Sequence, residues 1–581
     1  MTTRRPRWRW LPLCVLALML ALPGVASAAA GAPALAPADP DFVRFMELDQ
    51  SRQRTALLAP PLAEHGALGL IPSPIDLSHM EGASLPVSVT ASPEAFDLRT
   101  QGKLTPVRDQ GPWGACWTFA AYASLESFLL PGSAEDYAEE HMALRHGFDW
   151  GINDGGNKDM ASAYLGRWSG PVNEGDDPYG DGVTPSGLTA VGHVQDILYL
   201  PPRAGAADNG SIKWALQTHG AVFSTVRWET AAYEPATSAF YYDGAESANH
   251  GIAIVGWDDA YSRTNFATQP PGDGAFIVRN SWGSAWGLGG YFYVSYHDAV
   301  LGEDNAVFTA EPLQNYSAAY QHDELGATAY VGWPWMANRF VAGASDEGLA
   351  AVAFYAPAPD TAYEVYYGTT LAGRQLLTTG SIAVPGYRTI KLPEPQALSA
   401  GQAFYVIVKL VAPTTQFPVA IEYPYENYSS GASSAANESF ASPDGSSWTD
   451  MGAVGSPIRS NVCLKAFTVW HEPEVTSPPK WRATLNLSRS QVKVSERVTF
   501  SGSVKTEAGS AGKGVVTIQK RPAAGGSWVN WRTDTLSSRG TYSVVVRMTN
   551  ARTWHMRARM PGNATNSTGY SATKKLTVVA R

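Results

Sequence analysis

The segment Gln110-Gly111-Pro112-Trp113-Gly114-Ala115-Cys116-Trp117-Thr118-Phe119 places a lone cysteine where a Gly- and Pro-rich turn gives way to a helical pattern. Apolar side chains follow at close to helical spacing, and a Pro-Gly pair then ends the run: Phe119, Tyr122, Leu125, Leu129 and Pro131-Gly132. A thiol at the start of a helix sees the positive end of the helix dipole, which favours the thiolate. The sequence therefore predicts a helix that begins near Cys116 and carries a nucleophile.

A cysteine nucleophile needs a base and a group that orients the base. The candidate base is His250, which opens the strand-like run N-H-G-I-A-I-V-G-W at residues 249–257. The candidate orienting group is Asn280, in the run R-N-S-W-G at residues 279–283. Cys116 and His250 are 134 residues apart, and His250 and Asn280 are 30 residues apart. Taken singly, each residue also fits a packed core position or a simple turn.

Together, the three segments resemble the papain family of cysteine peptidases, in which a G-[SA]-C-[WY] run is followed far downstream by His and Asn. The resemblance implies that Cys116 attacks, His250 is the base, Asn280 orients His250, and Trp282 shields that bond from water. It also implies an oxyanion hole made of the Gln110 side chain and the Cys116 N–H. One position departs from the family, because Trp113 stands where a disulfide-forming cysteine is usual.

The same resemblance assigns substrate contacts. Gly155 and Gly156 correspond to the glycine pair that binds substrate backbone, although a plain turn would read the same way. Asn157, Lys158 and Thr225 would border the pocket for the second residue before the cut, and they are more polar than an aromatic-accepting pocket needs. No run of residues has metal-ligand spacing or forms a phosphate loop, so we expect no metal and no cofactor.

Residues 1–28 have the pattern of an export signal. Four arginines precede an apolar centre at Leu11–Leu22, and Ala26-Ser27-Ala28 is a small-residue cleavage site. A membrane helix would need a longer apolar run, and no later stretch is long and apolar enough to span a bilayer. The sequence therefore predicts a secreted or extracellular protein, with cell-surface association as a further option.

Three cysteines are present, and Cys14 lies inside the export signal. Pairing the other two, Cys116 and Cys463, would consume the proposed nucleophile, so we expect both to be free. Cys463 lies in a strand-like run and is expected to be a small buried hydrophobic side chain.

The length of 581 residues exceeds one core, which predicts several domains. Residues 29–91, rich in Ala and Pro, are an N-terminal arm or a short prosegment; the long helical signature of inhibitory prosegments is missing, which favours an arm. Residues 92–310 are the papain-like domain, with a helical half and a β-barrel half. Its segments Phe96–Arg99 and Val107–Gln110 resemble the mature amino terminus of the family.

The rest of the chain has the pattern of two all-β sandwiches. Short strand-like runs recur over residues 311–470, which resemble the lectin-like domains that follow some microbial papain-type domains. A linker is expected at residues 471–480. Residues 481–581 alternate clearly and resemble the Ig-like modules of bacterial surface proteins. The expected fold is thus multidomain: an α+β papain-like domain, then two β-sandwiches.

Charge is distributed unevenly. Residues 480–581 hold 18 Lys and Arg against three acids, a net charge of +15, while the whole chain carries −9. This surplus exceeds what solubility requires. It suggests that the C-terminal domain binds an anionic cell-envelope polymer or polysaccharide, whereas nucleic acid is a weaker partner for an exported protein.

The favoured function is hydrolysis of peptide bonds in proteins or peptides by a secreted cysteine endopeptidase, through a thioester acyl-enzyme. Two other functions fit the sequence. One is a surface adhesion or carbohydrate-binding protein with a vestigial peptidase domain. The other is a related acyl-transfer enzyme, such as a transpeptidase or an exopeptidase. The intact set of Cys116, His250, Asn280 and Gln110 favours the peptidase.

Overall fold

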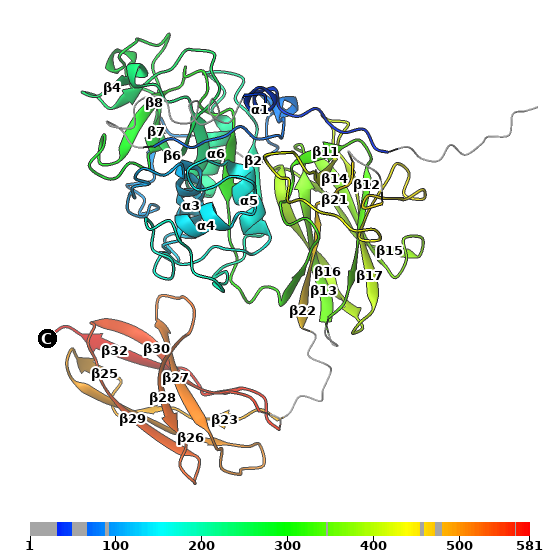
Figure 1. Cartoon of the computed structure of the whole chain (residues 1–581). Coiled ribbons are helices and arrows are strands. Elements are labelled where there is room, and N and C mark those ends of the chain that lie inside the picture. The colour runs from blue at the N-terminus through cyan, green and yellow to red at the C-terminus, as the bar shows by residue number, and fades with distance from the viewer. Residues whose placement is uncertain are drawn as a thin grey trace, which may run out of the picture.

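The computed structural model describes residues 32–48, 67–87, 92–343, 347–453, 458–470, 479–563 and 565–581. The predicted export signal lies outside these residues, as does most of the predicted linker. Figure 1 shows three lobes, which correspond to the papain-like region, the lectin-like region and the C-terminal sandwich. None of the described helices has the length and the apolar content that crossing a bilayer requires.

The papain-like lobe has a helical half and a β half, as predicted. Its helices are α3 (Cys116–Leu129), α4 (Glu139–Arg145), α5 (Lys158–Gly166) and α6 (Gly210–Thr218). Its strands are β1 (Ala95–Asp97), β2 (Ile197–Leu200), β3 (Val222–Val226), β4 (Tyr233–Glu234), β5 (Ala239–Phe240), β6 (His250–Asp258), β7 (Ala275–Arg279), β8 (Tyr291–Ser295) and β9 (Asn305–Phe308). Short 3₁₀ turns lie at Thr230–Ala232 and Arg263–Asn265.

Helix α3 is the buried centre of this lobe. Its residues Cys116–Ser127 are all buried, so the helix is packed on every side and not on one apolar stripe. It contacts β3, β6 and β9 on one side and α4 and α5 on another. A helix surrounded in this way has a fixed position and direction, and its first residue is therefore held firmly.

The lectin-like lobe is a sandwich that shares a sheet with the papain-like lobe. Its strands are β10 (Ala318–Tyr320), β11 (Ala329–Val331), β12 (Trp335–Val341), β13 (Glu347–Ala356), β14 (Thr361–Gly368), β15 (Arg374–Ile382), β16 (Gly386–Leu398), β17 (Ala403–Val411), β18 (Val419–Glu422), β19 (Ser439–Ser442), β20 (Thr449–Asp450), β21 (Asn461–Val462) and β22 (Leu464–Trp470). Strand β2 joins the two lobes, because it pairs with β9 on one edge and with β16 on the other.

The junction between β2 and β16 requires a glycine. Gly386 has φ +118°, and a Cβ there would lie 2.1 Å from the carbonyl oxygen of Ile197. Only glycine permits both this backbone conformation and this close approach. The result is one continuous sheet through both lobes, which the sequence did not reveal.

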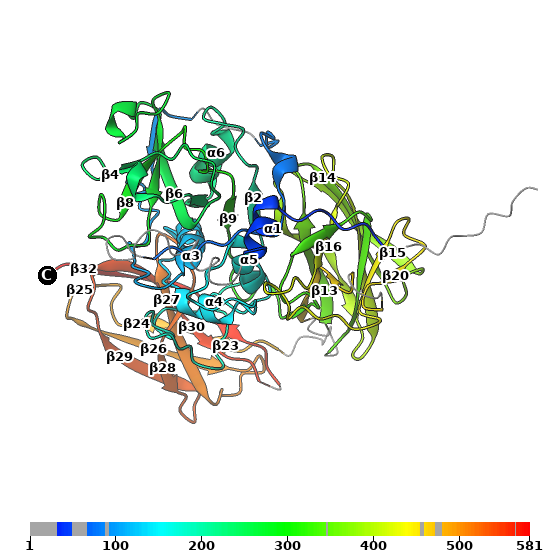
Figure 2. The ribbon, with the colours of Figure 1, turned by 45° about the horizontal axis from the view of Figure 1, so that its top comes forward.

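The N-terminal arm spans both lobes (Figure 2). Helix α1 (Pro40–Met46) packs Phe42 edge-on against Tyr425 and Tyr428 of the lectin-like lobe, with ring centroids 5.3 and 5.1 Å apart. Upstream of the helix, Leu35 forms an antiparallel bridge with Val331. Downstream, a 3₁₀ turn lies at Ser78–Met80, and the described part of the arm continues to residue 87.

The C-terminal lobe consists of two sheets around its own core. One sheet holds β23 (Arg482–Ala483), β24 (Asn486–Leu487), β26 (Arg497–Lys505) and β29 (Thr541–Arg547). The other holds β25 (Gln491–Lys493), β27 (Val515–Pro522), β28 (Val529–Thr535), β30 (Arg552–Met560), β31 (Gly569–Tyr570) and β32 (Lys574–Val579). The expected sandwich is therefore confirmed, and its resemblance to Ig-like modules stays a prediction.

We predict that a buried ion pair stabilises the lectin-like lobe. The Nζ of Lys465 lies 2.7 Å from Oδ2 of Asp323, and both side chains are buried. Asp323→Ala would leave the buried ammonium of Lys465 without its counter-charge and lower the free energy of unfolding by about 3–5 kcal/mol. Urea unfolding followed by tryptophan fluorescence measures this loss.

The matched control is Glu311→Ala, which breaks the Lys391–Glu311 pair, whose lysine side chain is 64% exposed. That change should lower the free energy of unfolding by less than about 1 kcal/mol. Equal losses in the two variants would show that the buried pair has no special role.

Candidate active site

The site is built where the start of helix α3 meets the start of strand β6. The backbone N–H of Gly251 donates to the Sγ of Cys116 at 3.2 Å. A Cβ at position 251 would lie 3.2 Å from the Cα of Trp117, so glycine allows strand and helix to approach this closely. Because His250 is the first residue of β6, the same contact brings the predicted base to the predicted nucleophile.

The side chain of Asn280 orients His250 from the end of β7. The Nε2 of His250 and the Oδ1 of Asn280 are 2.8 Å apart, and Oδ1 also accepts from the N–H of Ser281 at 2.8 Å. An amide oxygen only accepts, so Nε2 carries a proton and a neutral ring keeps its lone pair on Nδ1. That Nδ1 is buried and has no hydrogen-bond partner among the described residues.

Trp282 covers the histidine, as the resemblance implied. Its ring stacks on that of His250 with centroids 4.9 Å apart and planes 27° apart. Trp228 and Trp286 pack edge-on against Trp282 at 4.7 and 5.0 Å. The bond between His250 and Asn280 is therefore enclosed by aromatic rings and shielded from water.

Gln110 is aimed by the segment that holds Asn280. The Ser281 hydroxyl donates to Oε1 of Gln110 at 2.5 Å, and the Gln110 N–H donates to the Ser281 carbonyl at 2.8 Å. With Oε1 engaged, Nε2 faces the other way and donates to the carbonyl oxygens of Trp113 at 2.8 Å and Leu68 at 3.4 Å. Ser281 was not singled out from the sequence, since only its contact with Gln110 reveals its importance.

Residues 67–72 of the N-terminal arm run through this site. The Gly156 N–H donates to the Gly69 carbonyl at 3.0 Å, and the Ile71 N–H donates to the Gly156 carbonyl at 3.0 Å. The bridge between Leu70 and Gly156 is parallel. These contacts use the glycine that the resemblance assigned to substrate backbone.

The arm segment is held at two further points, Leu70 and Ala67. The Leu70 N–H donates to the Asn249 carbonyl at 3.2 Å, and the indole N–H of Trp282 donates to the Ala67 carbonyl at 3.1 Å. Gly69 has φ +146°, and a Cβ there would lie 2.3 Å from the backbone of Gly114. Glycine is therefore required at position 69 for the arm to lie against the turn before Cys116.

Burial suppresses ionisation of the candidate catalytic pair, Cys116 and His250, in this arrangement. Desolvation raises the pKa of Cys116 to about 12, against a lowering by the N–H groups of Gly251 and of the first turn of α3. Desolvation also lowers the pKa of His250 to about 4, although its bond to Asn280 raises it. The sequence predicted a thiolate, but with residues 67–72 in place the structure favours the neutral thiol beside a neutral imidazole.

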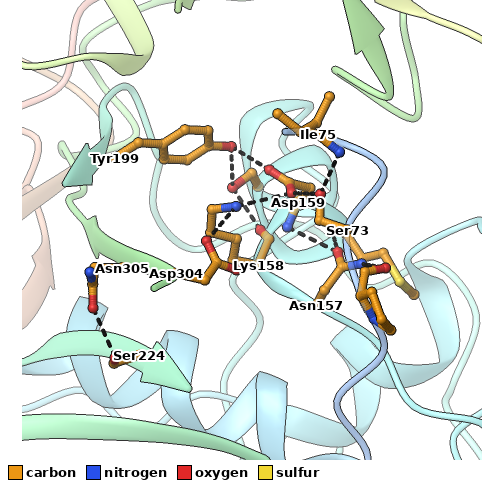
Figure 3. A network of polar contacts seen from close by, with 12 residues as sticks. Ser73, Ile75, Asn157, Lys158, Asp159, Tyr199, Ser224, Asp304 and Asn305 are labelled. Carbon is orange, nitrogen blue, oxygen red and sulfur yellow. Dashed lines mark hydrogen bonds and ion pairs between the residues drawn. The ribbon is translucent and has the colours of Figure 1, made fainter. Parts of the chain in front are cut away.

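A buried ionic cluster lies beside the glycine pair, at the first turn of α5 (Figure 3). The Nζ of Lys158 lies 2.7 Å from Oδ1 of Asp304 and 3.1 Å from Oδ2 of Asp159. Asp159 also accepts from the Tyr199 hydroxyl at 2.8 Å and from the Ser73 hydroxyl of the arm at 2.5 Å. Asp159 and Asp304 were missed in the sequence, because neither belongs to a recognisable motif.

A cavity of about 380 Å³ opens over this cluster. Lys158, Asp304 and Thr225 line it together with arm residues such as Ile71 and Ser73. The side chain of Asn157 points elsewhere: its Oδ1 caps α5, and its Nδ2 donates to the Tyr428 hydroxyl at 3.0 Å and to the Pro72 carbonyl at 3.3 Å. Of the predicted pocket residues, Thr225 and Lys158 thus line the cavity and Asn157 supports its wall.

Two known families match this chain. The papain family of cysteine proteases matches residues 92–310, and the lectin-like domain family matches residues 319–468. A cathepsin L-like peptidase of Aedes aegypti is 29% identical over 217 residues, which cover 34% of this chain and 58% of that protein. Cysteine proteinase 2 of Entamoeba histolytica is 31% identical over 217 residues, 34% of this chain and 62% of its own. This chain therefore spans about three fifths of the length of these relatives.

The solved structures include one that pairs both domains. The crystal structure of the cysteine protease and lectin-like domains of Cwp84, a surface layer associated protein of Clostridium difficile, aligns with a TM-score of 0.63 and 25% identity. It covers 75% of this chain and 98% of that one. The structure of Cwp84 after propeptide cleavage covers 64% of this chain and 99% of that one, with a TM-score of 0.59 and 26% identity. Residues 92–310 of this chain are a papain-family cysteine protease domain, and a lectin-like domain follows them.

Proposed function

We propose that this protein is an endopeptidase that hydrolyses peptide bonds through Cys116, His250 and Asn280. The observation that carries the proposal is the hydrogen bond between His250 Nε2 and Asn280 Oδ1, which leaves Nδ1 with a lone pair at the strand start that contacts the Cys116 sulfur. A base fixed in this tautomer accepts the thiol proton and later donates it to the leaving amine.

The mechanism follows from these positions. The Cys116 thiolate attacks the peptide carbonyl, and the oxyanion is held by the Cys116 N–H and the Gln110 side chain. The amine departs with the proton from His250, and a water molecule activated by His250 then hydrolyses the thioester. Gln110 contributes because its amide is already oriented by Ser281, so no reorganisation is needed as charge develops.

We further propose that residues 67–87 hold the enzyme inactive until they are displaced or removed. Their support is the pairing of Gly69 and Ile71 with Gly156 and the contact of the Leu68 carbonyl with Gln110, which together fill the site. Release of the segment would return water to Cys116 and His250 and restore the ion pair. Cwp84, whose structure is known after propeptide cleavage, offers a parallel from a similar protein.

We propose that the pocket for the second residue before the cut selects polar side chains. The cavity floor holds the ammonium of Lys158 between two carboxylates, and the buried Asp159 accepts from the Ser73 hydroxyl of the arm. When the arm leaves, that carboxylate loses a donor. A substrate side chain with a hydroxyl, amide or amine restores the bond, whereas an aromatic or aliphatic side chain leaves it unmade.

The accessory domains are proposed to attach the enzyme to a surface outside the cell. The match of residues 319–468 to lectin-like domains is our reason for proposing carbohydrate binding. The net charge of +15 over residues 480–581 is our reason for proposing an anionic envelope polymer or polysaccharide as the partner of the C-terminal domain. The similar protein Cwp84 is described as surface layer associated.

The proposed chemistry predicts a graded set of losses. Cys116→Ala should abolish cleavage of a denatured protein substrate by enzyme from which the arm has been removed. Gln110→Ala should lower kcat/KM by about 10²-fold or more, because one oxyanion donor is worth about 3 kcal/mol. Mass spectrometry of the products distinguishes internal cuts from end trimming. Wild-type enzyme that shows no Cys116-dependent cleavage would leave only the adhesion function.

The proposed inhibition predicts that Gly69→Val exposes the thiol. A side chain at position 69 meets the backbone of Gly114, so the arm cannot seat. Cys116 should then react with iodoacetamide at pH 7 at least about tenfold faster than in the wild-type chain, because its pKa falls once water returns. Peptide mapping separates Cys116 from the buried Cys463.

Ser84→Val is the control, since Ser84 lies in the same arm but is exposed. It should leave the labelling rate unchanged. A Gly69→Val chain that reacts no faster than the control would show that the arm does not suppress the thiol.

We predict that the charges of the proposed pocket give the enzyme a preference for polar side chains at the second residue before the cut. In a peptide library, activated enzyme should cleave sequences with Ser, Thr, Asn or Lys as the second residue before the cut about tenfold better than those with Phe or Leu. Lys158→Met with Asp159→Asn and Asp304→Asn removes all three charges and should reduce this ratio several-fold. Lys391→Met with Glu311→Gln removes a surface pair and should not. An unchanged ratio in the first variant would disprove the role of the cluster.

A further inference from the structure

The C-terminal sandwich carries a cluster of arginines on the outer face of one sheet. On β30, the buried residues Met556, Ala558 and Met560 alternate with His555, Arg557 and Arg559, which therefore project away from the core. On β27, Gln519 pairs with Arg557 and Arg521 pairs with His555. Arg521, Arg557 and Arg559 thus share one face; we call these three side chains the arginine face.

Two aromatic rings hold the centre of the arginine face in place. The guanidinium of Arg557 lies 4.2 Å from the ring centroid of Trp528 and 4.0 Å from that of Tyr570. Its Nε donates to Oε1 of Gln519 at 2.8 Å. A guanidinium stacked between rings and bonded through Nε is held in one plane, and its terminal N–H groups have no acceptor among the described residues. It is therefore preorganised to receive a carboxylate or a phosphate in bidentate geometry.

The arginine face has no counter-charge in the described part of its domain. Ion pairs occur there only at Arg482–Glu507 and Arg489–Glu496. The third acid, Asp534, pairs across the strands with the buried Val516, so it lies on the inner side of the sheet. It accepts there from the N–H of Ser543, on the other sheet.

Arg521 and Arg557 lie close together, because both guanidinium groups stack on the ring of Trp528. The pKa of Arg557 is lowered by partial burial and by the positive charges of Arg521 and Arg559. The Nε of Arg521 is buried without a hydrogen-bond partner among the described residues, while its guanidinium lies 4.8 Å from the Trp528 ring centroid. Three clustered cations without a partner destabilise the fold unless a bound anion offsets their mutual repulsion.

We propose that the arginine face binds an acidic polysaccharide, with the guanidinium groups of Arg521, Arg557 and Arg559 paired to successive anionic groups of the chain. This inference rests on the proposed surface attachment and assigns it to one sheet face. A single-stranded nucleic acid would need free aromatic faces for its bases. Here the guanidiniums already lie over Trp528 and Tyr570, which favours a partner recognised by its anionic groups alone.

The test compares two double variants of the full chain that remove the same charge. Arg557→Gln with Arg559→Gln alters the arginine face. Arg497→Gln with Arg547→Gln alters a cross-strand pair of exposed arginines on the opposite sheet. Polygalacturonate is the probe, neutral dextran is the uncharged control, and binding is measured by biolayer interferometry at 50 and 150 mM salt. Circular dichroism checks that each variant is folded, and peptide cleavage after removal of the arm checks that its peptidase domain is intact.

The expected result is binding to polygalacturonate and not to dextran. The first double variant should bind at least about tenfold more weakly, and the second no more than about threefold more weakly. Arg557→Lys keeps the charge but not the planar stack, so it should weaken binding several-fold.

Three outcomes would overturn the inference. Equal losses in the two double variants would mean that binding follows net charge and not this face. Tighter binding of duplex DNA, with the same dependence on Arg557 and Arg559, would make the face a nucleic-acid site. Failure of the wild-type chain to bind any polyanion would remove both this inference and the proposed role of the basic domain, and the peptidase proposal would be unaffected.

Discussion

The structure depends on two close contacts with Trp117, one made by Gly251 and one made by Gly156. A Cβ at Gly251 would meet the backbone of Trp117 at 3.2 Å, and a Cβ at Gly156 would meet its indole ring at 2.3 Å. Helix α3 is thereby fixed against the strand that begins with His250 and against the wall formed by the glycine pair. The candidate nucleophile, the candidate base and the proposed substrate wall are positioned by one buried tryptophan and two glycines, which explains why the site keeps its geometry between two separate halves of the fold.

The same burial that orders the site also alters its ionisation. With residues 67–72 in place, burial raises the pKa of Cys116 to about 12 and lowers that of His250 to about 4, so one proton is held by the thiol and the imidazole is neutral. The released ion pair that we propose holds the same single proton on the imidazole, so this pair makes docking depend little on pH. The acids around the neighbouring cavity behave differently.

Burial, with a smaller contribution from nearby carboxylates, raises the pKa of Asp39 to about 6 and that of Glu303 to about 7. For these groups the docked state holds extra protons, so docking is favoured at low pH and weakens as pH rises through about 6 to 7. The pH dependence of docking therefore comes from these acids and not from Cys116 and His250.

The candidate catalytic side chains, which the structure brings together, could be singled out in the sequence because each one lies in a short run whose neighbours identify it. The residues that the sequence did not reveal act through contacts between distant segments. Lys158 and Asp304 meet only in the folded chain, and the hydroxyl of Tyr428 reaches Asn157 from another domain. The pairing of β2 with β16 involves two residue pairs, which are too few to produce a periodic pattern in the sequence. The neutral state of Cys116 likewise depends on an arm whose own composition resembles a linker.

These distant contacts make the lectin-like domain part of the proposed substrate wall. Asn157 follows the glycine pair directly, caps helix α5, and donates to Tyr428, which is fully buried at the junction. Phe42 of the arm packs on the other side of Tyr428. Removing the arm would uncover Tyr428 while leaving its bond to Asn157 in place. The lectin-like domain therefore supports the proposed substrate wall before and after the arm departs, and it cannot move away without loosening the glycine pair that we propose to bind substrate backbone.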